Sequence, residues 1–330
     1  MFSTPAVVGE LVYIGSCSGI LYALDRATGR PRWSQDVRPQ GRGTSFHGDP
    51  LVIDSMLVIG TDGGNADSTF GEIFAFDLAS GRVLWKHSTT DGIVSDVCRV
   101  GDRLLAVTRA DSLLCLDAAT GRLAWSYRGD GPLYEVAYRS PAVAGGRVFF
   151  PGSDGTVHAL DAGSGRLLWK RDLRDRITTG ILALGDALFL GASGVQVYRL
   201  RQDTGVVEAR LNLKGPTLGP PTLVGDSLIV LVGERSLTCV GRSLAGIRWL
   251  QPFTDKLSSS RPYLWRGAVL AGTEKGELLA FRASDGLPRW SHPLKGVIRG
   301  IGTTDRVLYV GTQQGTVYAY ARPALPFGGR

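Results

Sequence analysis

A thirteen-residue segment recurs along almost the whole chain. Its clearest copy, residues 157–169, reads VHALDAGSGRLLW. Apolar residues alternate with others up to Leu160, which is the period of a β-strand, and a second strand is predicted to end at Trp169. Between them, Asp161 can accept hydrogen bonds from the backbone that follows it, and Gly165 can adopt the positive φ that closes a tight turn. Each copy is therefore predicted to be a β-hairpin.

Eight copies are found, at residues 21–33, 73–85, 113–125, 157–169, 197–209, 237–249, 278–290 and from 317 onward. Turn glycines at Gly29, Gly81, Gly121, Gly165 and Gly205 are 52, 40, 44 and 40 residues apart. A period of roughly 40–45 residues with four strands per repeat is typical of a β-propeller. We expect residues 1–330 to form one domain, an all-β, eight-bladed propeller of four-stranded antiparallel blades.

Most copies end in a tryptophan on the outer strand, well placed to cover a neighbouring copy. We expect these tryptophans to dock between blades, and Trp125 and Trp169 to be largely buried there. The predicted docking residues are Trp33, Trp85, Trp125, Trp169, Trp249 and Trp290, with the turn glycines Gly29, Gly81, Gly121 and Gly165. Repeat five has Ala209 in place of the tryptophan, and repeat six has Ala245 in place of the glycine.

The second repeat carries an insertion at residues 61–71, between its second and third strands. Asp62, Asn65 and Asp67 could offer oxygens to a hard cation, but their spacing matches no calcium loop. Stretches rich in glycine and aspartate are usually solvated turns. We therefore expect no metal there.

The eighth repeat lacks an outer strand. Where the tryptophan should stand the sequence has Gly329, and two prolines in residues 322–330 remove ladder donors. Residues 2–8 are already assigned as the inner strand of the first repeat. We expect a closed ring whose last blade has three regular strands, and a natural chain that continues upstream of Met1.

No run of about eighteen apolar residues occurs, so no membrane span is predicted. The N-terminus has neither a basic segment nor an apolar core, so no signal peptide is recognised. Cys115 and Cys239 take positions that hold alanine in other repeats, as small buried side chains would. The sequence has no Cys-x-x-Cys motif, so no zinc site is predicted. Of the histidines only His47 is expected near the ring axis, and no pair of base and nucleophile is predicted.

The pattern Ala-x-Asp-x-x-Thr-Gly-x-x-x-Trp at residues 23–33 returns at 75–85 and 159–169 with serine for threonine, and at 115–125 with cysteine for alanine. It resembles the tryptophan-docking motif of pyrroloquinoline-quinone-type propellers, and the resemblance covers the whole chain. That family includes quinoprotein alcohol dehydrogenases, non-enzymatic BamB-like propellers and sensor domains attached to bacterial kinases. The motif itself is architectural and implies fold rather than chemistry.

In the dehydrogenases, the resemblance implies a quinone on the axis beneath a disulfide between adjacent cysteines, and a calcium ion held by carboxylate and amide groups. Here no two cysteines are adjacent. Asp49, Asp96 and Glu135 are expected to stand singly in connecting loops. We therefore expect no cofactor and no catalysis, with pyrroloquinoline quinone and calcium as the alternative.

The chain has a net charge of +7. Basic residues gather in the loops that join one blade to the next, and the candidate interaction face consists of Arg42, Arg139, Arg176, Lys214, Arg261 and Arg299. These residues form either an ordinary solvated surface or a face for an acidic protein, an anionic ligand or nucleic acid. Nearby aromatic residues are few, which disfavours nucleic acid.

We expect a monomeric, non-catalytic scaffold for protein partners, resembling the BamB-like branch. The alternatives are a sensor propeller that binds an anionic ligand as part of a larger chain, such as a kinase, and a fragment of a quinone-dependent dehydrogenase. The resemblance favours the periplasm or cell envelope, and a complete sequence would favour the cytoplasm.

Overall fold

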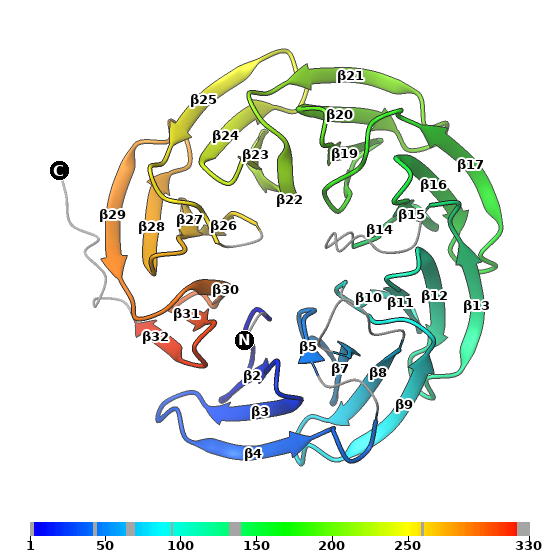
Figure 1. Ribbon diagram of the computed structural model, residues 1–330, viewed down its shortest axis with the longest axis vertical. Helices are drawn as coiled ribbons and strands as arrows, with labels where there is room; N and C mark the ends of the chain where they lie inside the picture. Colours follow the sequence, from blue (N-terminus) through cyan, green and yellow to red (C-terminus); the bar gives the residue numbers. More distant parts are fainter. Residues whose placement is uncertain are drawn as a thin grey trace.

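The structure is a computed structural model that describes residues 3–41, 45–63, 70–93, 95–131, 140–258 and 261–321. These residues form β-strands and no helix. The strands make eight antiparallel sheets, which stand around a central axis as the blades of a ring (Figure 1). The prediction of an eight-bladed all-β propeller is confirmed.

Each blade runs from an inner strand near the axis to an outer strand at the rim. Blade one contains β1 (Ala6–Val8), β2 (Leu11–Gly15), β3 (Ile20–Asp25) and β4 (Pro31–Asp36). Blade two contains β5 (Ser45–Phe46), β6 (Leu51–Ile53), β7 (Met56–Asp62), β8 (Gly71–Asp77) and β9 (Val83–Thr89). Blade three contains β10 (Cys98–Val100), β11 (Arg103–Val107), β12 (Ser112–Asp117) and β13 (Leu123–Arg128). Blade four contains β14 (Ala142–Ala144), β15 (Arg147–Pro151), β16 (Thr156–Asp161) and β17 (Leu167–Asp172).

The second half of the ring repeats this order. Blade five contains β18 (Leu182–Leu184), β19 (Ala187–Gly191), β20 (Gln196–Arg201) and β21 (Val207–Asn212). Blade six contains β22 (Thr217–Val224), β23 (Ser227–Val232), β24 (Ser236–Gly241) and β25 (Ile247–Pro252). Blade seven contains β26 (Tyr263–Trp265), β27 (Ala268–Gly272), β28 (Glu277–Arg282) and β29 (Pro288–Pro293), and blade eight contains β30 (Ile298–Thr303), β31 (Val307–Thr312) and β32 (Val317–Ala321).

The recurrent hairpin forms as its residues dictate. In blade four, the backbone amide and the hydroxyl of Ser164 both donate to Asp161 Oδ1, at 2.8 and 2.7 Å. These two hydrogen bonds hold the pKa of the Asp161 carboxyl below its usual value. Gly165 closes the turn with a φ of 71°.

Five of the docking tryptophans reach across to the turn of the following blade. The Trp125 indole donates through Nε1 to the carbonyl of Ala162 at 3.2 Å, and its ring covers Gly165, where a Cβ atom would lie 2.6 Å from the indole. The same arrangement joins Trp33 to Leu78 and Gly81, Trp85 to Ala118 and Gly121, Trp169 to Gln202 and Gly205, and Trp249 to Ala283 and Gly286. These five tryptophans are half-buried, which for Trp125 and Trp169 is less than expected, whereas Trp290 is buried.

The boundary between blades five and six uses a different pairing. Blade five has Ala209 at the tryptophan position, and the turn of blade six presents Leu244, which is 4% exposed and packs in the same apolar cluster as Ala209. Leu244, with a φ of 55°, is the left-handed residue of this turn, one position before the Ala245 assigned from the sequence. At this interface the large side chain, Leu244, comes from the turn and the small one, Ala209, from the outer strand. At the five interfaces above, the outer strand supplies the large tryptophan and the turn supplies the small glycine.

The ring closes between blades eight and one. The residues before β1 run beside β30, where a Cβ on Gly300 would lie 2.5 Å from the Ser3 carbonyl and one on Gly302 would lie 2.3 Å from the Pro5 carbonyl. The described part of blade eight has three strands, and residues 322–330 lie outside the described residues. No tryptophan covers Gly29 among the residues described, since a Cβ there would meet nothing within 4 Å.

Inner strands are interrupted where they approach the axis. In blade two both β5 and β6 pair with β7, and residues 47–50 turn away between them. The insertion predicted at residues 61–71 is partly strand, because β7 extends to Asp62 and β8 begins at Gly71. Asn65 and Asp67 lie outside the described residues.

Candidate interaction face and axial cluster

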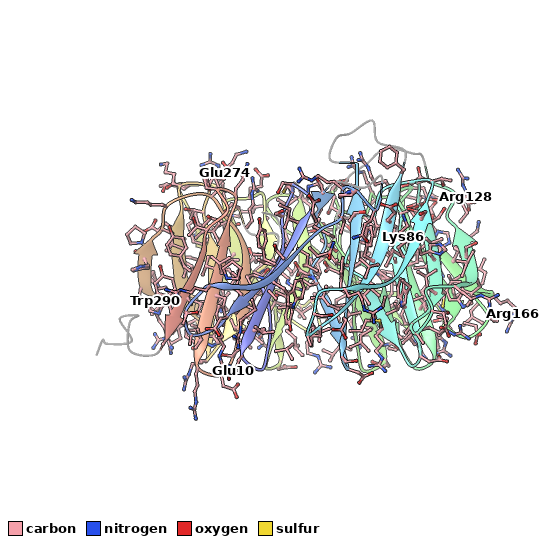
Figure 2. All side chains as sticks on the ribbon, turned by 90° about the horizontal axis from the view of Figure 1, so that it is seen from below. Glu10, Lys86, Arg128, Arg166, Glu274 and Trp290 are labelled. Atoms are coloured by element: carbon pink, nitrogen blue, oxygen red, sulfur yellow. The ribbon has the colours of Figure 1, made fainter. Side chains whose placement is uncertain are left out.

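One face of the ring carries the connections from each outer strand to the next inner strand, together with the turns between second and third strands. We call it the loop face. Arg128 and Glu274 lie on this side of the disc, whereas Glu10 and Arg166 lie on the opposite side, which carries the recurrent hairpin turns (Figure 2). Loops held at fixed angles by a rigid scaffold are where binding function usually resides.

The predicted basic residues have different surroundings on this face. Arg176 and Lys214 are exposed. Arg299 is half-buried and donates from its Nη2 to Gln313 Oε1 at 2.8 Å. Arg261 is half-buried and pairs with Asp49. Arg42 and Arg139 lie outside the described residues.

Acidic side chains are interspersed with the basic ones. Ion pairs on the loop face join Arg38 to Asp36, Lys170 to Asp130, Lys256 to Glu234 and Lys275 to Asp255, with N to O distances of 2.6, 3.2, 2.8 and 2.5 Å. Exposed pairs such as these add about 0–1 kcal/mol each to stability. They do neutralise charge locally, so the face is mixed rather than uniformly positive.

Two aspartates and an arginine meet near the axis. Arg261 Nη2 lies 3.3 Å from Asp49 Oδ2, and the Asp49 backbone amide donates to Asp96 Oδ1 at 2.9 Å. The side chains of Asp49 and Arg261 are 26% and 37% exposed. The expectation that Asp49 and Asp96 stand singly was wrong, because the inner strands of blades two and three are interrupted and the segments leading into β6 and β10 approach one another. Glu135 lies outside the described residues.

The electrostatics of this axial cluster are unbalanced. The pKa of Asp49 is raised from 3.8 to about 6, first because the surrounding protein removes water from the carboxyl group and second because the charge of Asp96 is close; Arg261 opposes both effects. Burial disfavours the Arg261 charge, but Tyr263 and Asp49 outweigh it and raise the pKa of the guanidinium. The cluster therefore holds two acidic groups against one fixed cation.

Hydrogen bonds connect this cluster to other blades. Thr4 donates its backbone amide to Asp49 Oδ1 at 2.6 Å, and its hydroxyl lies 3.0 Å from the Tyr263 hydroxyl. Ser140 donates to Asp96 Oδ2 at 3.3 Å. Arg261 also lies over the Tyr263 ring, 5.2 Å from its centroid. Segments from blades one, two, three, four and seven are thus tied together around the axis.

Asp62, a candidate cation ligand from the sequence, is instead paired with a histidine. Its Oδ2 lies 2.8 Å from His47 Nδ1, and His47 in turn is close enough to Cys17 to lower the pKa of its thiol. Within the described residues, no group of three or more His, Cys, Asp or Glu side chains could hold a metal ion. Cys17 and His47, which the fold brings near one another, are 30 residues apart and come from different blades.

Comparison with known proteins identifies the family. The family model described as "Outer membrane protein assembly factor BamB" matches residues 2–70, 69–217, 153–252 and 251–323. The chain belongs to this BamB family. No helix in the described part of the chain has the length and apolar character that a membrane span requires.

Individual relatives support the same family. The outer membrane protein assembly factor BamB of Burkholderia pseudomallei (strain K96243) is 29% identical over 256 residues, which are 71% of this chain and 62% of that protein. The match therefore spans less than two thirds of the relative. The crystal structure of BamB from Moraxella catarrhalis has a TM-score of 0.82 at 19% identity and covers 96% of both chains, which shows a shared fold.

Likeness to enzymes of the same fold is partial. The quinohemoprotein alcohol dehydrogenase ADH IIB of Pseudomonas putida is 34% identical over 87 residues, 26% of this chain and 12% of the enzyme. Such a match covers only a small part of either chain.

The sequence interpretation of this BamB-family propeller missed both polar clusters. Their members carry no common motif, and most of them lie in connections that look like solvated loops. One signal was available: Asp49, Asp96 and Arg261 each lie in the segment that leads into an inner strand, the part of a propeller blade nearest the axis.

Proposed function

We propose that this propeller is a non-catalytic scaffold for protein partners in outer-membrane protein assembly, located in the cell envelope. The observation that carries the proposal is the match to the BamB family along residues 2–323. The mixed-charge loop face presents many short loops on a rigid disc, which suits contacts with several segments of a protein partner.

The hydrogen bonds of the carboxylates near the ring axis support the proposal that the protein does not catalyse a quinone-dependent reaction. A calcium ion bound by carboxylates needs oxygens that are free to coordinate it. Here the Asp49 carboxylate accepts from Arg261 and from the Thr4 amide, and the Asp96 carboxylate accepts from Asp49 and Ser140. The chain also lacks adjacent cysteines. These hydrogen bonds and the lack of adjacent cysteines support the proposal that the protein does not hold the quinone and calcium implied by the enzymes.

We further propose that the partner presents acidic groups to the loop face. Arg176 and Lys214 are exposed there on neighbouring connections, between β17 and β18 and between β21 and β22. Complementary charge at the edge of an interface speeds association and makes binding sensitive to salt. Arg261 is a poor probe of this contact because it holds the axial cluster together.

The test compares two charge-reversed variants of the tagged protein. R176E/K214E alters the loop face, and R122E/R166E is the matched control, since both of its arginines are exposed on the opposite face. Each is used to capture partners from detergent-solubilised envelopes of the source bacterium, with outer-membrane assembly proteins quantified by mass spectrometry. The loop-face variant should capture several-fold less, and wild-type capture should fall with salt.

Two outcomes would contradict the proposal. Equal capture of assembly proteins by the loop-face variant and the wild type at low salt would remove the loop face from the contact. Calcium-dependent binding of pyrroloquinoline quinone with submicromolar affinity would contradict a non-catalytic role.

A further inference from the structure

Cys17 lies at a groove between the first and last blades. The groove has a volume of about 900 Å³ and is lined by residues that include Ser16, Cys17, Tyr22, Tyr309 and Val317. Cys17 is half-buried in the turn between β2 and β3. A small molecule or an extended segment in the groove can therefore reach the region of its thiol.

The backbone brings His47 to this thiol. Gly15 ends β2, and a Cβ atom there would lie 2.6 Å from the Cβ of Phe46, so only glycine lets blade two approach this closely. Phe46 donates its amide to the Ser16 carbonyl at 3.3 Å, and Ser45 donates its hydroxyl to the Cys17 carbonyl at 2.8 Å. The segments that carry Cys17 and His47 are thus fastened to one another through Ser45 and Phe46, directly before His47.

Asp62 completes a carboxylate, imidazole and thiol arrangement. The His47 and Asp62 side chains are 19% and 4% exposed and lie 2.8 Å apart. Burial alone would lower the pKa of His47, but the hydrogen bonds to Asp62 and Cys17 outweigh it and raise the pKa to about 9. Burial would likewise raise the pKa of Cys17, and the hydrogen bond to His47 helps to outweigh it, so that the pKa lies below the usual value. An imidazolium beside a thiol favours the thiolate, which is the nucleophilic form.

We propose that Cys17 is a thiol–disulfide exchange site whose thiolate is stabilised by the His47–Asp62 pair. The Cys17 sulfur attacks one sulfur of an incoming disulfide R–S–S–R at the groove. A new bond forms between Cys17 and that sulfur, the original S–S bond breaks, and the leaving R–S⁻ takes up a proton from solvent. The exchange needs no oxidant other than the disulfide itself.

The other cysteines provide an internal comparison. Cys98 is also half-buried, but burial and the nearby Asp96 charge raise its pKa to about 12. Cys115 and Cys239 are 0% and 1% exposed. A protein with four free thiols is therefore expected to show a single fast one.

The experiment uses the folded full-length chain and 4,4′-dithiodipyridine, a neutral disulfide whose release of thiopyridone is followed by absorbance from pH 5 to pH 9. One thiol per chain should react in a fast phase. The rate of this phase should rise with pH, and the midpoint of the rise should lie below about 8.5, the pKa of a free thiol. C17S should abolish the fast phase, whereas C98S should keep it. H47Q should slow it about tenfold at pH 6, because each unit of increase in the thiol pKa lowers the thiolate fraction about tenfold. D62N should act in the same direction.

Near-ultraviolet circular dichroism and urea unfolding establish that each variant is folded. If H47Q does not fold, the proposal is still tested by the pH midpoint of the wild-type reaction and by the loss of the fast phase in C17S. A fast phase that survives in C17S, a wild-type midpoint at or above 8.5, or an unchanged pH profile in folded H47Q would each overturn the proposal.

Discussion

Asp49 contacts both an acid and a base, and its protonation is set by their balance. Burial and the Asp96 charge favour the neutral carboxylic acid, whereas Arg261 and the Thr4 amide favour the carboxylate. The first pair of effects is larger, since the pKa of Asp49 rises from 3.8 to about 6. The folded protein therefore holds a proton on Asp49 over a pH range in which the unfolded chain has lost it.

The Asp49→Asn variant should reveal this proton in the pH dependence of stability. A carboxyl whose pKa is raised by folding stabilises the protein below its unfolded pKa, and this contribution is lost as pH rises through the folded pKa. The free energy of unfolding of the wild type should thus fall relative to that of D49N between about pH 4 and pH 6, by on the order of 2 kcal/mol. Urea unfolding across pH 4–8 measures the difference. The control is D102N, which removes a carboxylate that is 82% exposed; a D49N profile parallel to the wild type would refute the assignment.

In blades two, three and four, each recurrent hairpin links its blade to both neighbouring blades, because its tryptophan and its turn lie at different interfaces. Trp169 donates to Gln202 at 3.1 Å and covers Gly205 of blade five, while Gly165 in the turn of the same hairpin is covered by Trp125 of blade three. The turn of each such hairpin is thus covered by the tryptophan of the preceding blade, and its own tryptophan covers the turn of the following blade. Where the tryptophan is replaced by Ala209, Leu244 from the following turn fills the space.

Removing one of these contacts should weaken the interface between two blades. Trp169→Ala should lower the free energy of unfolding by about 2–3 kcal/mol, somewhat less than for a fully buried aromatic residue because the indole is half-buried. Leu168→Ala is the matched control on the same strand, since Leu168 is 38% exposed. Equilibrium urea unfolding followed by circular dichroism gives both values. A loss below about 1 kcal/mol for W169A would show that the docking contact adds little.

For the whole molecule, closure of the ring depends on the N-terminal segment. Residues 3–5 pass beside β30 with their backbone against Gly300 and Gly302, and Thr4 then reaches Asp49 and Tyr263 at the axis. The first described residues therefore join blade eight to blades one, two and seven. An unsealed boundary would leave strand edges and apolar faces exposed to solvent and to other chains.

Gly302→Ala tests this closure. The added methyl group would lie 2.3 Å from the Pro5 carbonyl oxygen, so the N-terminal segment has to move, at a cost of about 1–3 kcal/mol. Gly246→Ala is the control, because a Cβ there meets nothing within 4 Å. Thermal and urea unfolding should show a loss for G302A alone. Equal stability of the two variants would mean that the contact beside β30 does not limit closure.

The sequence by itself determined the repeat, the hairpin turns and the number of blades. These features depend on residues within about thirteen positions of each other, such as Asp161, Ser164 and Gly165, whose side-chain and backbone chemistry acts locally. The family resemblance followed from the same local pattern and is confirmed by the match along the chain.

Only the tertiary structure decided which polar residues meet. Arg261 and Asp49 are 212 residues apart, and Cys17 and His47 come from different blades. Their encounters depend on the closure of the ring and on the interruptions of the inner strands, which place particular loops near the axis. A residue's local pattern does not encode its distance from such remote groups, so burial, pairing and pKa at these sites follow from the folded ring alone.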